Sequence, residues 1–284
     1  MKRQTGDTLN MLCAAGFVLL VLLLTFWFYA AHTRSEETEP ASDSPSDQSQ
    51  PAITEVSYPF EEPARGPFRL PSAAFPLDEA EQARIKREVV SLSSYMVEEE
   101  PSLAASPGLF IQPEVLLPLS RLAEEFRAVY PYARLEVISA FTPGATAPAA
   151  TGYALALAVA VGGGLAPLSS GTPEGAWLLA RRAEFGFVSS PTAASEGEFL
   201  YVGCPHARLM EDRGLSPGAY IAYLRLCPKE RPLTFSQNGV SYSLFYLPAA
   251  PDGTATLSLP EGTPFSVTPD GASGFLIVLK SDDL

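Results

Sequence analysis

The hydrophobic positions of residues 154–161 alternate strictly along the chain, in the string ALALAVAV. Alanine occupies every second position, and leucine or valine occupies the positions between. A period of two predicts a β-strand with one bulky face and one face that carries only methyl groups. The bulky face suits a hydrophobic core, whereas the methyl face needs another explanation.

Apolar residues at helical spacing predict several helices around this strand. The firmest begins at Pro113, continues as one apolar stripe and ends before Pro131. Helices are expected at residues 76–100, 113–130, 172–184, 205–212 and 217–226, and further short strands at 135–140, 185–190 and 199–202. Together these elements predict an α+β domain over residues 58–232, with helices packed on an antiparallel sheet.

The pattern changes after residue 232. Four short apolar segments are separated by turn sequences such as Pro251-Asp252-Gly253, and they cover residues 240–247, 255–259, 265–268 and 274–279. Short apolar runs between such turns are typical of β-strands. Residues 233–284 are therefore expected to form a small all-β appendage.

The N-terminal part of the chain predicts a membrane anchor. Residues 11–31 contain no charge and are long enough for one transmembrane helix. Lys2 and Arg3 precede this segment, so the positive-inside rule places residues 1–10 in the cytoplasm and the later residues outside, as in a single-pass membrane protein. A cleaved signal peptide is the alternative, although its apolar core would be shorter. Residues 32–57 are acidic and poor in apolar residues, and are expected to form a disordered tether.

Charge and cysteine content narrow the range of partners. The net charge is −13 at pH 7, which argues against a nucleic-acid partner and against docking on anionic lipid. Cys13 lies in the expected anchor, whereas Cys204 and Cys227 could form a disulfide or remain free thiols. The sequence leaves this pairing open.

The sequence lacks the common catalytic constellations. Of the two histidines, His32 lies at the membrane border and only His206 lies in the expected folded part, so a zinc site with two histidines cannot be built there. Cys204 and His206 could share a metal, but a packing or capping role is the simpler explanation. No G-x-S-x-G sequence lies at an expected strand-to-helix junction, where a nucleophilic serine would need it. Glu196 and Glu198 could act as acid and base, although two exposed acids before a strand are commonly only solvated.

The order of several segments resembles that of a known family. The stretches VISAFT, PGATAPAATGYALAL, WLLARRAEFGFVSSP and EGEFLYVGCPHARLMEDRGLS follow one another as in VanY-type D-alanyl-D-alanine carboxypeptidases. These are zinc peptidases that trim the peptide stems of bacterial peptidoglycan. The resemblance covers residues 113–279 and implies a VanY-like carboxypeptidase core, with zinc as the family's cofactor.

The family's zinc-binding motif S-x-H-x-x-G-x-A-x-D matches this chain without its ligands. Aligning the motif on Gly152 and Ala154 puts its histidine at Ala149 and its aspartate at Ala156. The resemblance therefore implies that two metal ligands have been replaced by alanine.

The two remaining family motifs are altered as well. Aligning E-x-W-H on the segment Tyr201-Val202-Gly203 puts the catalytic base at Ser195 and the last zinc-binding histidine at Glu198. The substrate-binding motif S-G-Y-R-S corresponds to residues 139–143, where Thr142 replaces the arginine. Every position that would carry the family's chemistry thus departs from the pattern.

These departures explain the methyl face as an active-site wall whose ligands have been replaced, because an alanine methyl cannot coordinate a metal. We expect no catalytic residue, no bound metal and no other cofactor. The expected function is that of an extracytoplasmic pseudoenzyme that binds cell-wall stem peptide or an envelope partner. The residues expected to line its groove are Phe141, Thr142, Tyr153 and Glu196. The alternatives are an active carboxypeptidase with displaced chemistry and a purely structural interaction domain.

Overall fold

The computed structural model divides the chain into two units, residues 1–50 and 51–284. It describes residues 53–59, 68, 79–94, 102–141, 151–237, 239–251, 254–270 and 274–282, which all belong to the second unit. The expected cytoplasmic tail (1–10), transmembrane helix (11–31) and most of the tether (32–57) lie outside these residues. Among the residues that are described, no helix is long and apolar enough to cross a membrane.

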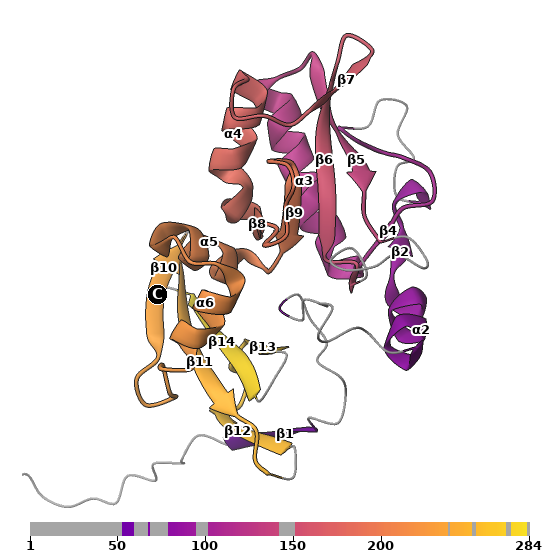
Figure 1. The fold of residues 1–284 in the computed structure, drawn as a ribbon. Helices are drawn as coiled ribbons and strands as arrows, with labels where there is room; N and C mark the ends of the chain where they lie inside the picture. The colour runs from indigo at the N-terminus through magenta and orange to yellow at the C-terminus, as the bar shows by residue number, and fades with distance from the viewer. Residues whose placement is uncertain are drawn as a thin grey trace, which may run out of the picture. The chain divides into compact units, whose positions relative to one another are not determined.

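The sheet with the most strands is a mixed sheet of six, seen in the upper part of Figure 1. Its strands follow the order β3-β5-β6-β9-β8, and β7 also pairs with β6. Their bounds are Leu103–Ala105 (β3), Ala133–Ser139 (β5), Ala154–Val161 (β6), Gly164–Pro167 (β7), Phe187–Ser189 (β8) and Glu198–Tyr201 (β9). Every pairing is antiparallel except that of β3 with β5. The expected α+β class is confirmed, and β6 has the bounds that the alternation predicts.

Helix α3 (Pro113–Val129) covers the bulky face of the sheet and builds the core. Its apolar stripe is completely buried, at Val115, Leu119, Leu122 and Phe126, and belongs to one cluster with Leu157 on β6. Each such side chain contributes about 1.5–3 kcal/mol when it is fully buried. The remaining helices are α2 (Glu79–Glu88), α4 (Pro173–Arg181), α5 (Cys204–Arg213) and α6 (Pro217–Leu224).

The helix expected at residues 76–100 is shorter than its periodicity predicts. Helix α2 ends at Glu88, and β2 (Val90–Ser91) and a 3-10 turn (Leu92–Ser94) follow it. Strand β2 pairs with β4 (Phe110–Ile111), so Val90, which fits a loose helical pattern, lies in a strand instead. Its β-branched side chain favours that outcome.

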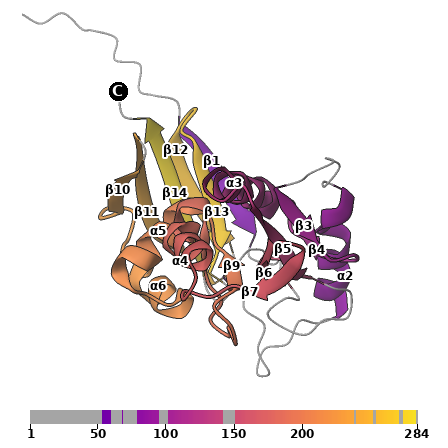
Figure 2. The same ribbon diagram turned by 90° about the horizontal axis from the view of Figure 1, so that it is seen from above.

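The C-terminal segment forms a second sheet, in the order β10-β11-β14-β13. The bounds of its strands are Leu233–Gln237 (β10), Val240–Pro248 (β11), Phe265–Pro269 (β13) and Gly274–Asp282 (β14). Strand β10 was not predicted, because its apolar residues are few and it is defined by its pairing with β11. Figure 2 shows these strands grouped beside α5 and α6.

Strand β12 (Thr254–Pro260) pairs with β1 (Ile53–Pro59), from the other end of the unit. This pairing corrects the expected tether, because residues 53–57 are part of an antiparallel ladder. The edge of β12 supplies the ladder hydrogen bonds of this segment. Strands β1 and β12 form a separate two-stranded sheet, so the β structure of the C-terminal part includes a strand from before the α+β domain.

The C-terminal sheet is buried on both faces. Leu244 and Leu276 belong to the same apolar cluster as α3, α5 and α6, whereas Phe245 and Phe275 face a second cluster with Leu257 on β12. One hydrophobic cluster thus crosses the expected boundary at residues 232–233. We expect the two sheets to unfold together rather than as separate bodies.

Gly175, near the start of α4, sits where a side chain has no room. A Cβ atom there would lie 1.9 Å from the backbone oxygen of Ser169. We therefore expect Gly175→Ala to lower the free energy of unfolding by about 2 kcal/mol, as overpacking does. The matched control is Gly218→Ala in α6, where nothing lies within 4 Å of the added Cβ and the change should be neutral or stabilise by about 0.5–1 kcal/mol. Urea denaturation of both variants measures the difference, and equal effects would contradict this account.

Candidate functional site

A cavity of about 240 Å³ opens on the methyl face of β6. Residues of three neighbouring strands and of the loop after β8 line it, namely Ser139, Ala154, Leu155, Ala156, Ser190, Glu198 and Phe199. Ala156 pairs with Ser139 on β5 and with Glu198 on β9. The three residues therefore form one row across the sheet, with an alanine at its centre.

A β-bulge sets this row. The register between β5 and β6 shifts between Val137 and Ser139, so that Ser139 rather than Ile138 lies opposite Ala156. An extra residue of this kind redirects the side chains that follow it and is frequent beside active sites. The half-exposed Ile138 side chain is turned away from the row as a result.

The methyl face is more buried than an open active-site wall would be. Ala154, Ala156 and Ala158 keep 5%, 9% and 1% of their surface exposed. The segment before β9 also lies tightly against the edge of β6, because Gly197 accepts a hydrogen bond from the Leu157 N–H at 2.9 Å. A Cβ on Gly197 would lie 2.5 Å from the Leu157 oxygen, so only glycine fits there.

Glu198 is tied into the turn that precedes it. Its Oε1 accepts hydrogen bonds from the Ala194 N–H and from the Ser195 hydroxyl, both at 3.2 Å. The structure therefore places the Ser195 hydroxyl against the Glu198 carboxylate. In this chain the two residues bind each other.

Glu196 points to a different loop. Its carboxylate accepts hydrogen bonds from the Ser170 N–H and from the Ser170 hydroxyl, both at 2.6 Å. These bonds lower the pKa of Glu196, which is exposed to solvent and does not line the cavity. Glu196 and Glu198 thus contact different segments and do not converge as an acid–base pair.

Two other residues expected in the groove are buried among neighbouring side chains. Tyr153 is 8% exposed and donates a hydrogen bond to Glu114 at the start of α3. Its pKa is raised, mainly because the side chain is buried and secondly because of this hydrogen bond. Phe141 is 5% exposed and packs against Ile85. Neither residue lines the cavity. Thr142 and Ala149 lie outside the described residues, so their roles stay predictions.

Ser190 is a cavity residue that sequence reasoning missed. It is 6% exposed, and its N–H donates to the Glu198 backbone oxygen at 2.9 Å. The string Ser189-Ser190-Pro191 indicated only the end of a strand. The pairing of β8 with β9 decides that this end faces the cavity.

The described residues do not fit a zinc ion at this site. Ala156 has no donor atom, and Glu198 offers one carboxylate whose Oε1 already accepts two hydrogen bonds. Within the part of the chain that the structure describes, no group of three His, Cys, Asp or Glu side chains could hold a metal. We therefore derive no chemical step that uses zinc.

The Cys204–His206 pair does not form a site either. The Cys204 thiol donates to the Glu184 oxygen at 3.3 Å, and His206 Nδ1 is hydrogen-bonded to the Tyr220 hydroxyl at 2.8 Å. The two side chains thus have separate partners inside the core. Cys204 and Cys227 are free thiols, which decides between the two states that the sequence left open.

Comparison with known proteins supports the resemblance seen in the sequence. No protein-family model matches the chain. A D-alanyl-D-alanine carboxypeptidase from Enterococcus faecium is 24% identical over 116 residues, which are 38% of this chain and 37% of that protein. The chain therefore spans little more than a third of the length of this relative.

One solved structure shares the fold over most of the chain. The vancomycin-resistance D,D-dipeptidase VanXYg, solved in complex with a D-Ala-D-Ala phosphinate analogue, superposes with a TM-score of 0.62 and 15% identity, over 81% of this chain and 100% of that one. A vancomycin-resistance D,D-pentapeptidase VanY mutant, solved with Zn(II), gives a TM-score of 0.39 and 17% identity, over 54% of this chain and 98% of that one. The chain is thus similar in part of its sequence to a D-alanyl-D-alanine carboxypeptidase, and the likeness to VanXYg shows its fold.

Proposed function

We propose that this chain is a pseudoenzyme that binds the peptide of the cell wall in the Ala156–Glu198 cavity and does not cleave it. One observation carries the proposal: Ala156 and Glu198 pair across β6 and β9 beside a cavity, at the positions where the resemblance places an aspartate and a histidine. The location of the family's site is retained, while its metal-binding side chains are replaced. Binding and catalysis use separable contacts, so one can persist without the other.

The expected affinity is low. Thr142 stands where the family has an arginine, so a charge-assisted hydrogen bond to the peptide carboxylate is missing. The net charge of −13 also opposes an anionic ligand, more strongly at low salt. We expect a dissociation constant in the millimolar to high-micromolar range, roughly −4 to −6 kcal/mol.

The same proposal places the protein at the cell surface, held by the apolar segment 11–31 with its N-terminus in the cytoplasm. The charge pattern around that segment supports this topology. An extracytoplasmic domain on such an anchor would have direct access to wall peptide or to an envelope partner.

A purely structural interaction domain is the second candidate. The cavity volume of about 240 Å³ favours it, because ligand pockets commonly measure about 300–1,000 Å³. A space of this size accommodates a terminal residue rather than a whole stem peptide. An active enzyme that uses Glu196 and Glu198 is less well supported, since their carboxylates contact different segments.

Ala156→Leu is the test of peptide binding at this cavity. We expect the full-length protein to bind a synthetic peptide ending in D-Ala-D-Ala weakly, to release no D-alanine from it, and to lose at least fivefold in affinity when leucine fills the cavity. Calorimetry measures the binding, and an assay for free D-alanine measures the cleavage.

Ala80→Leu, at an exposed position of α2, is the matched control and should bind like the unaltered protein. Equal binding by both variants would rule out this cavity as the binding site. Release of D-alanine that scales with protein concentration would refute the proposal that the chain is a pseudoenzyme.

A further inference from the structure

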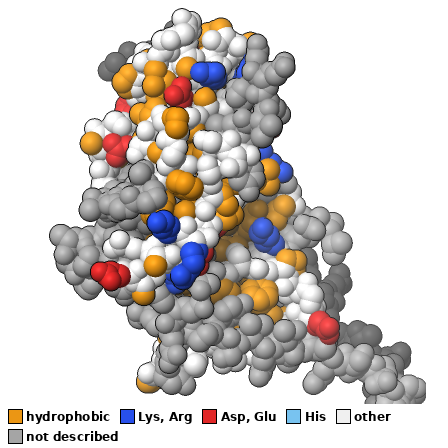
Figure 3. Space-filling model, turned by 90° about the vertical axis from the view of Figure 1, so that its right-hand side faces the viewer, with side chains coloured by type: hydrophobic (Ala, Val, Ile, Leu, Met, Phe, Trp, Pro, Cys, Tyr) orange, Lys and Arg blue, Asp and Glu red, His pale blue; other side chains and the backbone are white. Residues whose placement is uncertain are grey.

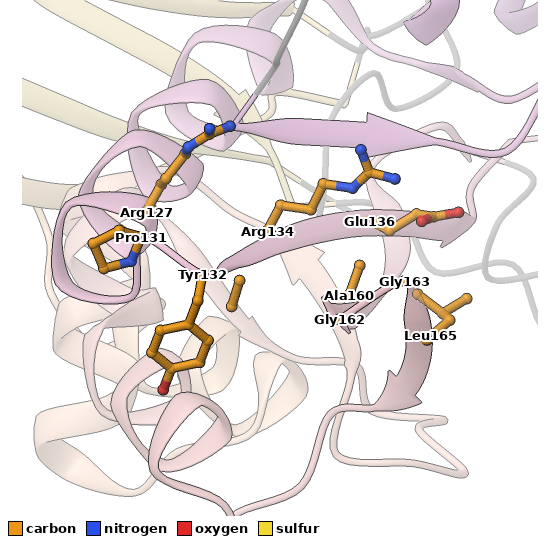
Figure 4. Close-up of a pocket in the computed structure, with 11 residues that line it drawn as sticks. Arg127, Pro131, Tyr132, Arg134, Glu136, Ala160, Gly162, Gly163 and Leu165 are labelled. Carbon is orange, nitrogen blue, oxygen red and sulfur yellow. The ribbon is translucent and has the colours of Figure 1, made fainter.

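A second cavity, of about 400 Å³, lies at the opposite end of β6. It is formed by the last turn of α3, the turn into β5 and the β6–β7 hairpin (Figure 4). It shares no lining residue with the Ala156–Glu198 cavity. Its chemistry is therefore independent of the function proposed above.

The strand register places a basic and an apolar side chain on either side of a small residue, Ala160. Ala160 pairs with Arg134 on β5 and with Leu165 on β7. Directly paired residues project from the same face of a sheet, so the alanine methyl lies between two longer side chains. The small residue at Ala160 thus leaves space between a guanidinium and an apolar wall.

Two arginines reach this cavity from different elements. Figure 4 shows Arg127 extending from α3 and Arg134 from β5 to one side, while the Tyr132 ring points to the other. Arg134 is exposed and makes no hydrogen bond or ion pair with another residue that the structure describes. Glu136 also lines the cavity, so the arginines outnumber the acids there.

This concentration of positive charge is unusual for the chain, which has 19 basic and 32 acidic residues. The face shown in Figure 3 is mostly hydrophobic or uncharged, with a few basic side chains, some of them beside acidic ones. A guanidinium presents two parallel N–H donors that match a carboxylate. The cavity therefore suits an anion better than a cation.

The hairpin side of the cavity is open and partly apolar. Gly162 and Gly163 have φ values of 59° and 82°, and nothing lies within 4 Å of a Cβ atom on either residue. Leu165 is 51% exposed, and Tyr132 is 61% exposed with its hydroxyl donating to Glu174 at 2.7 Å. The exposed leucine provides an apolar surface beside the two arginines.

We propose that this cavity is a binding site for a small organic anion, a carboxylate attached to a short apolar group. Arg134, assisted by the charge of Arg127, binds the carboxylate. Leu165 and Ala160 contact the apolar group. The open glycine hairpin lets the ligand approach.

The test uses the full-length protein and N-acetylalanine as the probe, with N-acetylalaninamide as the same molecule without its charge. We expect N-acetylalanine to bind at least tenfold more tightly than the amide in a calorimetric or NMR titration. Arg134→Gln should weaken its binding at least fivefold. The control Arg208→Gln removes an exposed arginine of α5 that pairs with Asp212, and should bind normally.

Each further comparison supports or overturns one part of the proposal. Ala156→Leu should leave N-acetylalanine binding unchanged, which separates this site from the cavity of the proposed function. Equal binding of acid and amide, or equal losses in Arg134→Gln and Arg208→Gln, would overturn the proposal. Inorganic phosphate that binds as tightly as N-acetylalanine would overturn the role of Leu165 and the apolar group.

Discussion

Replacing Asp270 by alanine is expected to lower the free energy of unfolding by about 3 kcal/mol. The Asp270 side chain is fully buried at the end of β13, and its Oδ2 accepts hydrogen bonds from Arg225 Nη2 at 2.6 Å and Nε at 3.1 Å. Its two carboxylate oxygens also accept from the Tyr246 hydroxyl and from the Gly274 N–H. Hydrogen bonds to charged groups contribute about 1.5–3 kcal/mol each, but a lost set is not additive.

This residue joins the C-terminal sheet to the end of helix α6, because Arg225 follows α6 and Asp270 connects β13 to β14. The bonds to Asp270 raise the pKa of Arg225, as expected for a stabilised guanidinium. Asp212→Ala is the matched control, since Asp212 is half-exposed and pairs only with its helical neighbour Arg208. That change should cost less than about 1 kcal/mol in urea denaturation. A loss in Asp270→Ala no larger than in the control would contradict the role given to this contact.

The second large effect is acid destabilisation through His206. This side chain is 4% exposed, is hydrogen-bonded to Tyr220, and meets the Phe68 ring edge-on at 5.4 Å between ring centroids. Burial disfavours the charged imidazolium and lowers the pKa of His206 to about 4, from the 6.5 of an exposed histidine.

The lowered pKa means that the unfolded chain binds a proton that the folded chain excludes between pH 6.5 and pH 4. Stability from His206 is therefore complete above pH 6.5 and is lost as the pH falls through this window. A shift of this size corresponds to about 3 kcal/mol at most. The measurement is the free energy of unfolding at pH 7, 6, 5 and 4, for the unaltered protein and for His206→Gln.

Glutamine does not titrate, so the difference between the two proteins isolates His206 from the carboxylates, which titrate in both. We expect His206→Gln to be less stable at pH 7 and to lose that disadvantage progressively towards pH 4. Parallel curves over the whole range would show that burial of His206 does not set the acid response.

Most of the local structure could be predicted from the sequence. The alternation over residues 154–161 depends only on neighbouring positions, and β6 has those bounds. Helix α3 begins at Pro113 and ends just before the proline that cannot continue it. The resemblance to VanY-like proteins was also visible in the order of segments, and the fold agrees with it.

The candidate site was predictable in part. Alignment on Gly152 and on residues 201–203 singled out Ala156 and Glu198, and the structure pairs them across β6 and β9. The alignment did not show that Glu196 accepts hydrogen bonds from Ser170 or that Tyr153 donates one to Glu114. Those contacts join residues 26 and 39 positions apart, which no local pattern reports.

The sequence by itself therefore determined the period of β6, the ends of helix α3 and the replaced positions in the family motifs, because each depends on a few consecutive residues. Only the tertiary structure decided the bulge that places Ser139 opposite Ala156, the burial of the methyl face and the pairing of β1 with β12. The physical reason is that register and pairing are set by hydrogen bonds and packing between segments far apart in the chain. The alternation in the sequence predicted the alanine face, and the structure has the same face. The two cavities on that face arise from the strands that flank it.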